Sequence, residues 1–127
     1  MSLIFRTRRL VKPEDLNGQN ALFGGRLLSW IDEECYIFCA QKMKSDRIVT
    51  KYISELNFEN AAYRGDIVEI GVDVVKIGRT SLTVQCIVRD TKTKKEIVSV
   101  DKVVFVAIDE NHNPVPHNMS PEGQPSK

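Results

Sequence analysis

The chain has 127 residues, the length of one ordinary domain, and this length excludes a two-domain protein. Hydrophobic residues make up 42% and charged residues 28%, which is typical of a globular protein, and the net charge of +1 indicates neither a nucleic-acid groove nor a polyanionic tail. The longest apolar runs have six residues, whereas a membrane-spanning helix needs about 20, so we expect no membrane insertion.

The amino terminus and the cysteines together predict a cytoplasmic protein. The apolar residues at positions 3–5 are too few for a secretory signal, and Arg6 follows them at once. The three cysteines, Cys35, Cys39 and Cys86, are an odd number and do not have zinc-ligand spacing. We interpret them as buried thiols in a reducing compartment.

The first half of the chain predicts a strand, a loop and one long helix. Residues 3–9 are a short candidate strand, and residues 13–22 are a loop by composition because Asn and Gly favour turns. Apolar residues then recur at helical spacing over residues 23–43, which predicts a helix of about five turns. This helix is apolar nearly all round, so we expect it to be buried on several sides.

After the helix, apolar residues alternate with period two, which predicts strands joined by hairpin turns. The candidate strands are residues 47–58, 67–76, 81–89 and 96–108, with turns at 77–79 and 90–94. The residues expected to share the core face of the last strand are Val98, Val100, Val104, Val106 and Ile108. The fold class is therefore α+β, with one long helix against an antiparallel sheet of about five strands. The open edges of such a sheet favour dimerisation.

We expect residues 1–110 to form a single domain and residues 111–127 to form an irregular C-terminal tail, which holds four of the five prolines. Both histidines, His112 and His117, lie in this tail. A serine-esterase triad or a Cys-His pair needs a histidine held rigidly in the core, so we expect neither activity. No cluster of His, Asp or Glu has metal-ligand spacing.

Three consecutive acids, Asp32, Glu33 and Glu34, lie two turns into the apolar helix. At about 100° per residue, Glu33 points away from the apolar stripe, whereas Asp32 and Glu34 flank the stripe on opposite edges. The helical pattern does not choose between these two acids as a catalytic group. On periodicity alone, a surface patch that pairs with basic residues is the favoured interpretation.

Gly24 and Gly25 stand at the start of the same helix, and they change the balance between a surface patch and a catalytic acid. Free N–H groups at a helix N-terminus bind anions, and glycine lets a ligand approach the backbone closely. An oxyanion site at the helix start and a carboxylate two turns further on would hydrolyse an acyl group by water attack. The alternative is a helix entry crowded against a neighbouring strand.

Residues 17–34 resemble the hotdog-fold acyl-CoA thioesterases of the bacterial YciA and cytosolic acyl-CoA hydrolase type. The shared pattern is Phe-Gly-Gly at positions 23–25, with Asp32 seven residues after the second glycine. Two further blocks, at residues 47–58 and 76–81, are also similar to this family. The resemblance covers nearly all of the predicted domain.

The resemblance implies a sheet wrapped around a central helix, two subunits that join their sheets edge to edge, and dimers that assemble as a homohexamer. The active site then lies between subunits. Asp32 is the implied catalytic carboxylate, as general base or as nucleophile, and Asn17 comes from the facing subunit. The backbone N–H of Gly25 polarises the thioester carbonyl. The substrate- and CoA-binding residues implied are Phe23, Gly24, Thr50, Lys76, Gly78, Arg79, Thr80 and Ser81.

We therefore predict an acyl-CoA thioester hydrolase that releases free acid and coenzyme A by Asp-assisted water attack at a subunit interface. Coenzyme A enters as part of the substrate; no metal or redox cofactor, nucleic acid or membrane partner is expected. Family members often have glycine where this chain has Asn20, which tolerates the left-handed conformation, and a polar residue where it has Ala21. The acyl chain length stays open. The alternatives are a non-catalytic acyl-CoA-binding or sensor module of the same fold and a structural oligomer without a ligand.

Overall fold

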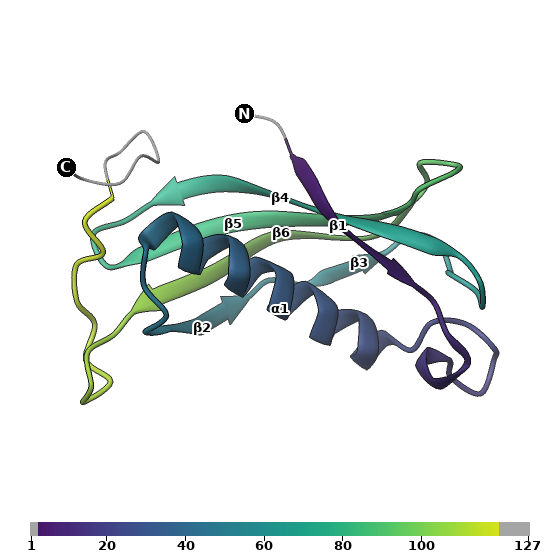
Figure 1. Ribbon diagram of the computed structural model, residues 1–127, viewed down its shortest axis with the longest axis horizontal. Helices are drawn as coiled ribbons and strands as arrows, with labels where there is room; N and C mark the ends of the chain where they lie inside the picture. Colours follow the sequence, from purple (N-terminus) through teal and green to yellow (C-terminus); the bar gives the residue numbers. More distant parts are fainter. Residues whose placement is uncertain (1–2, 120–127) are drawn as a thin grey trace.

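The computed structural model describes residues 3–119. One helix, α1 (Gly24–Met43), lies across one face of an antiparallel sheet, as Figure 1 shows. A 3-10 turn, η1 (Pro13–Asp15), precedes this helix. The strands are β1 (Ile4–Leu10), β2 (Ile48–Ile53), β3 (Leu56–Phe58), β4 (Ile67–Ile77), β5 (Ser81–Asp90) and β6 (Glu96–Ala107). The predicted α+β architecture is confirmed.

The sheet has the strand order β1-β4-β5-β6-β2, and the short strand β3 also pairs with β6, next to β2. The strand predicted at residues 47–58 is therefore two strands, and the sheet has six strands rather than about five. The break falls at Ser54, whose N–H donates to the Lys102 carbonyl (2.9 Å) and whose hydroxyl accepts from the Lys102 N–H (3.1 Å). Lys102 lies between the parts of β6 that pair with β3 and with β2.

A β-bulge in β6 changes which of its residues face the core. Val84 of β5 lies opposite Val103, and Cys86 lies opposite Val100, so β6 has one residue more than β5 over this stretch. Because side chains alternate, the extra residue moves those beyond it to the opposite face. The buried residues of β6 include Val98, Val100, Val103, Phe105 and Ala107. The predicted core face is therefore wrong for Val104, Val106 and Ile108.

Helix α1 buries one row of side chains against the sheet and leaves its outer face open. The buried row has a spacing of four residues and consists of Leu27, Ile31, Cys35, Cys39 and Met43. On the outer face, Leu28 and Ile37 are 37% and 44% exposed, because no second layer of residues 3–119 covers the helix there. The predicted burial on several sides is therefore not met within one protomer. No helix within residues 3–119 is both long and apolar enough to cross a membrane.

The three cysteines are buried free thiols, as predicted. A hydrogen bond with Cys86, together with burial, raises the pKa of the Cys35 thiol, and burial raises the pKa of Cys39 to about 12. Both thiols therefore stay protonated near neutral pH and are unreactive. They act as small apolar side chains between the helix and the sheet.

The described part of the predicted tail, residues 111–119, runs along the end of the sheet where β4 ends and β5 begins (Figure 1). His117 Nε2 lies 2.9 Å from the Ser81 carbonyl, and His117 Nδ1 accepts from the Met119 N–H at 3.1 Å. The expectation that the tail holds no histidine rigidly is wrong for His117, which is only 8% exposed. Its ring bonds backbone groups, so this position gives no catalytic triad. Residues 120–127 lie outside the described residues.

Candidate active site

Helix α1 begins with backbone donors that nothing in the described chain uses. Its first intrahelical bond runs from the Leu27 N–H to the Phe23 carbonyl at 3.0 Å, and Phe23 gives no side-chain cap. The N–H groups of Gly24, Gly25 and Arg26 therefore have no acceptor within residues 3–119. They form the positive end of the helix dipole, which is a site for an anion or a polarised carbonyl oxygen.

The surroundings of the two glycines favour ligand access over crowding as the reason for glycine. A Cβ atom at Gly24 would lie 3.6 Å from the ring of Phe58, which is an ordinary contact. A Cβ at Gly25 would lie 3.0 Å from the ring of Phe23, whose side chain is exposed and free to move. Packing therefore does not require glycine at these positions, and the open backbone is available to a ligand.

Asp32 lies at the β2 edge of the sheet and is half-buried. Its Oδ1 accepts a hydrogen bond of 2.8 Å from Thr50 Oγ1. The structure thus connects two predicted site residues. Because Thr50 stands on β2, this contact fixes the direction of the carboxylate at the open edge of the sheet.

The other two acids of the trio pair with strand β1. Glu33 is exposed and forms an ion pair with Arg9, as the helical pattern predicts for an acid on the outer face. Glu34 is 8% exposed and accepts a hydrogen bond from the Thr7 hydroxyl. Asp32 and Glu34 therefore face opposite edges of the sheet: Asp32 faces edge strand β2, and Glu34 faces edge strand β1.

One protomer does not bring Asp32 and Gly25 to the same atom. They are seven residues apart on one straight helix, and a rise of 1.5 Å per residue separates them by about 10 Å along the axis. A reacting carbonyl and its attacking water must lie roughly 3 Å from the groups that act on them. The acid and the free N–H groups of one chain therefore do not meet at one reacting carbonyl.

Asn17 lies near the start of α1, beside Gly24. Its Oδ1 accepts from the N–H groups of Gln19 (2.8 Å) and Ala21 (3.2 Å), which fixes the side chain within the loop. Its Nδ2 makes no hydrogen bond to residues 3–119, so it is free to donate. Asn17 and Gly24 line one cavity of about 430 Å³, and Asp32 does not. Asn20 has a φ of 62°, as expected for an asparagine that replaces glycine.

The hairpin at residues 76–81 lies at the end of the sheet where α1 ends, away from the helix start (Figure 1). The Gly78 N–H donates to the Ser81 carbonyl at 2.9 Å, and a Cβ at Gly78 would collide with the Ser81 hydroxyl. Lys76 and Arg79 are exposed, whereas Thr80 bonds the Ala107 N–H through its carbonyl. No contact within residues 3–119 links this turn to Asp32.

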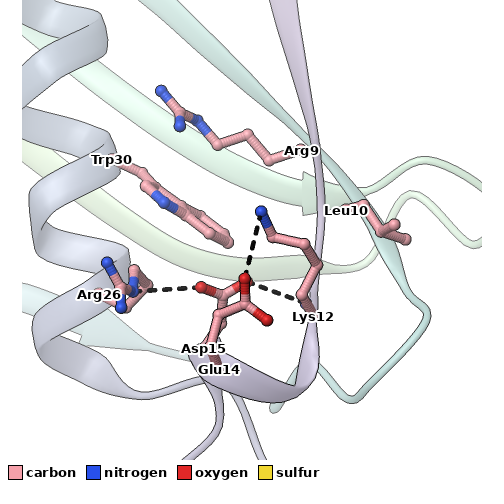
Figure 2. Close-up of a pocket in the computed structure, with 7 residues that line it drawn as sticks. All are labelled: Arg9, Leu10, Lys12, Glu14, Asp15, Arg26 and Trp30. Atoms are coloured by element: carbon pink, nitrogen blue, oxygen red, sulfur yellow. Dashed lines mark hydrogen bonds and ion pairs between the residues drawn. The ribbon is translucent and has the colours of Figure 1, made fainter.

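A second cavity, of about 490 Å³, lies between β1 and the start of α1 and contains none of the predicted site residues (Figure 2). Its charges are largely paired: Arg26 Nε lies 3.2 Å from Asp15 Oδ1, and Lys12 Nζ lies 3.7 Å from Glu14. Arg9 pairs with Glu33 and stacks over the Trp30 ring at 5.4 Å. Asp15 is a buried acid that the sequence pattern did not reveal, and it anchors the loop before α1.

Within residues 3–119, no group of three His, Cys, Asp or Glu side chains lies close enough together to hold an ion. The acids at the helix and sheet are instead used in ion pairs and hydrogen bonds with Arg, Lys and Thr side chains.

A family model described as the thioesterase superfamily matches residues 19–97, more than half of the chain. The chain belongs to this superfamily. The matched segment includes all of α1 and the hairpin at residues 76–81, whereas Asn17 lies just before it.

Individual relatives of this thioesterase superfamily member extend the match. YkhA of Bacillus subtilis, an uncharacterised acyl-CoA thioester hydrolase, is 32% identical over 118 residues, which are 91% of this chain and 67% of YkhA. The hexameric thioesterase y2039 from Yersinia pestis has a TM-score of 0.81 at 25% identity, over 91% of this chain and 93% of that one. The predicted hotdog fold is confirmed.

A third relative has been solved with a ligand. The acyl-CoA hydrolase from Staphylococcus aureus, in complex with butyryl coenzyme A and coenzyme A, has a TM-score of 0.78 at 26% identity, over 87% of this chain and 66% of that one. The same hydrolase has been solved as an aspartate-to-alanine variant and as an asparagine-to-alanine variant.

Proposed function

We propose that this protein hydrolyses acyl-CoA thioesters at sites shared between two copies of the chain. The observation that carries the proposal is the separation along α1, because a polarising helix start and a carboxylate about 10 Å away complete one another only across a subunit boundary. In each site, one subunit supplies Gly24, Gly25 and Asn17. The other supplies Asp32 and Thr50.

The open edge of the sheet supports such a dimer. Strand β2 pairs with β6 on one side, and no strand within residues 3–119 covers its other side. Val49 and Tyr52 of β2 and Phe58 of β3 are exposed along this edge. An apolar, unpaired edge favours pairing with a second copy around a twofold axis. The Yersinia pestis relative is hexameric, which supports further assembly of such dimers.

The chemistry follows from the two halves. The Gly25 N–H, with that of Gly24, binds the thioester oxygen and stabilises the negative charge that forms there. Asp32 accepts a proton from water as the water oxygen bonds to the carbonyl carbon. The C–S bond then breaks, and the proton passes from Asp32 to the coenzyme A thiolate. Thr50 holds Asp32 in the direction that this transfer needs.

Two further observations support the assignment of residues. The aspartate and the asparagine replaced by alanine in the Staphylococcus aureus hydrolase are fifteen positions apart in that chain, and Asn17 and Asp32 have the same separation here. Lys76 and Arg79 are exposed cations on a rigid turn, and such side chains suit the phosphates of coenzyme A by charge and, for arginine, by bidentate geometry.

Replacing the acid tests the function directly. We expect Asp32→Asn to lower kcat for thiol release from acyl-CoA by about 10²- to 10⁴-fold, because water loses its proton acceptor. The matched control is Glu33→Gln, which removes a neighbouring carboxylate of the same helix that faces solvent, and it should retain the parent rate. Parent-level activity of Asp32→Asn would disprove the assignment. Tight acyl-CoA binding by the parent without any thiol release would identify a binding or sensor module instead.

A further inference from the structure

The cavity of about 430 Å³ is lined by polar and apolar groups together. The polar groups include the unused N–H of Gly24, the free amide of Asn17 and the side chain of Glu59. The apolar lining includes Leu27, Ala62 and Ile97, which are 2%, 1% and 4% exposed and belong to the hydrophobic core. A ligand that matches both kinds of group has a polar carbonyl head and an apolar tail, and the volume is in the range of small-molecule sites.

We call this cavity the acyl groove. Hydrogen bonds between backbone and side-chain groups hold its walls in place. The Leu22 N–H donates to the Ala62 carbonyl at 2.8 Å and joins the loop before α1 to the loop after β3. The Glu59 N–H donates to the Ile97 carbonyl at 2.9 Å, and Asn60 Nδ2 donates to the Glu96 carbonyl at 2.7 Å. The groove is therefore formed before a ligand binds, and its size sets a limit on what enters.

The far end of the acyl groove meets charged surroundings. Asn60, Ala61 and Ile97 also line a neighbouring hollow of about 360 Å³, whose other side carries Asp66, Asp90 and Lys95. An apolar chain that extends past Ile97 would leave apolar contacts and desolvate these charges, which is unfavourable. Each methylene added to the chain therefore strengthens binding only up to this boundary.

We propose that the acyl groove holds the acyl chain of the thioester. We further propose that Ala61 and Ile97 set the chain length beyond which added methylenes no longer increase affinity. This inference rests on the proposed function. Ala61 has the small side chain at the boundary and is exposed, so the space beside it is available to a ligand rather than filled by the protein. The substrate class is then a short- to medium-chain acyl-CoA without a charged tail.

The experiment compares kcat/KM for acetyl-, butyryl-, hexanoyl- and octanoyl-CoA in the parent and in Ala61→Leu. Leucine fills the far end of the groove, and one methylene in an apolar pocket is worth about tenfold or more. We expect the octanoyl-to-acetyl ratio of kcat/KM to fall at least about tenfold in Ala61→Leu, with a smaller fall in Ala61→Val. The matched control, Gln41→Leu, adds the same side chain at an exposed helix position outside the groove and should leave this ratio unchanged.

A binding measurement separates this proposal from the proposed function. S-methyl-CoA and S-octyl-CoA are thioethers that cannot be hydrolysed, and calorimetry gives their affinities for the Asp32→Asn protein with and without Ala61→Leu. Selective loss of S-octyl-CoA affinity supports the groove even if the parent hydrolyses no acyl-CoA. An unchanged octanoyl-to-acetyl ratio in Ala61→Leu, or equal weakening of both thioethers, would overturn the groove assignment while leaving hydrolysis by Asp32 intact.

Discussion

At the scale of single residues, the contact between Asp32 and Thr50 gives a carboxylate on a helix a fixed direction. A side chain on α1 has rotamer freedom, and the hydroxyl on β2 removes part of it through one hydrogen bond of 2.8 Å. In the proposed reaction, a base must point at a water that lies against the neighbouring subunit. In this proposal Thr50 is a positioning residue, and it does not itself exchange a proton with the substrate.

Replacing Thr50 separates this role from a structural one. We expect Thr50→Val, which keeps the shape and removes the hydroxyl, to lower kcat by roughly tenfold with little change in KM, since a misdirected base acts on the transition state more than on binding. Thr50→Ser should restore most of the rate because it restores the donor. The measurement is steady-state thiol release, with thermal unfolding as the check on folding. A kcat of Thr50→Val equal to that of the parent would contradict the role.

At the scale of elements, the sequence predicted α1 and the position of every strand, but not the places where regular alternation breaks. The helical pattern placed Glu33 outward correctly. It did not decide between Asp32 and Glu34, because that choice depends on β2 lying at one edge of the sheet and β1 at the other. Strand order is a tertiary property that the local pattern does not contain.

The same limit applies to β6 and to the tail. Two consecutive charged residues, Asp101 and Lys102, interrupt the valines of β6, and this was the available signal for a bulge. The sequence does not mark His117 as buried, because one partner of its ring is the Ser81 carbonyl, 36 residues earlier in the chain. The candidate site was predictable to the extent that it lies on one motif, whereas the contact with Thr50 joins residues that only folding brings together.

The tail gives a prediction at this scale. We expect His117→Ala to lower the free energy of unfolding by about 1–2 kcal/mol, because the ring hydrogen bonds to Ser81 and Met119 are lost and a small void is left. His112→Ala is the matched control, since His112 is exposed, and its effect should stay within about 0.5 kcal/mol. Urea unfolding measures both. Equal stability of the two variants would show that the tail does not contribute through His117.

At the scale of the whole molecule, the proposed shared site makes activity a property of the assembled dimer, and this can be tested. We expect two inactive variants to rescue one another: Asp32→Asn keeps an intact helix start, and Gly25→Pro keeps an intact acid while removing one N–H at a position where proline is tolerated. Random pairing after co-expression leaves one complete site in each mixed dimer, so about a quarter of the parent activity should return.

The control for this experiment carries both changes in one chain. A double variant, Asp32→Asn with Gly25→Pro, supplies neither an intact acid nor an intact helix start. Random pairing places half of the parent chains in mixed dimers without a complete site, so about half of the activity of the parent chains should be lost. Thiol release from differentially tagged, co-purified dimers measures both mixtures. If the two single variants show no recovery and the double variant does not inhibit, each site lies within one chain, and the two-subunit arrangement is wrong.

The bulge in β6 has a consequence for how this chain tolerates changes in length. Asp101 and Lys102 together lie opposite one residue of β5, Gln85, so removing one of them would restore regular pairing with β5 and keep Phe105 and Ala107 in the interior. On the other side of β6, Ile53 lies opposite Val103 and Leu56 opposite Val100, so the same deletion would leave Ser54 and Glu55 opposite a single residue. A deletion at Asp101 or Lys102 would therefore move the irregularity from the β5 side of β6 to its β2 and β3 side, although both side chains are exposed.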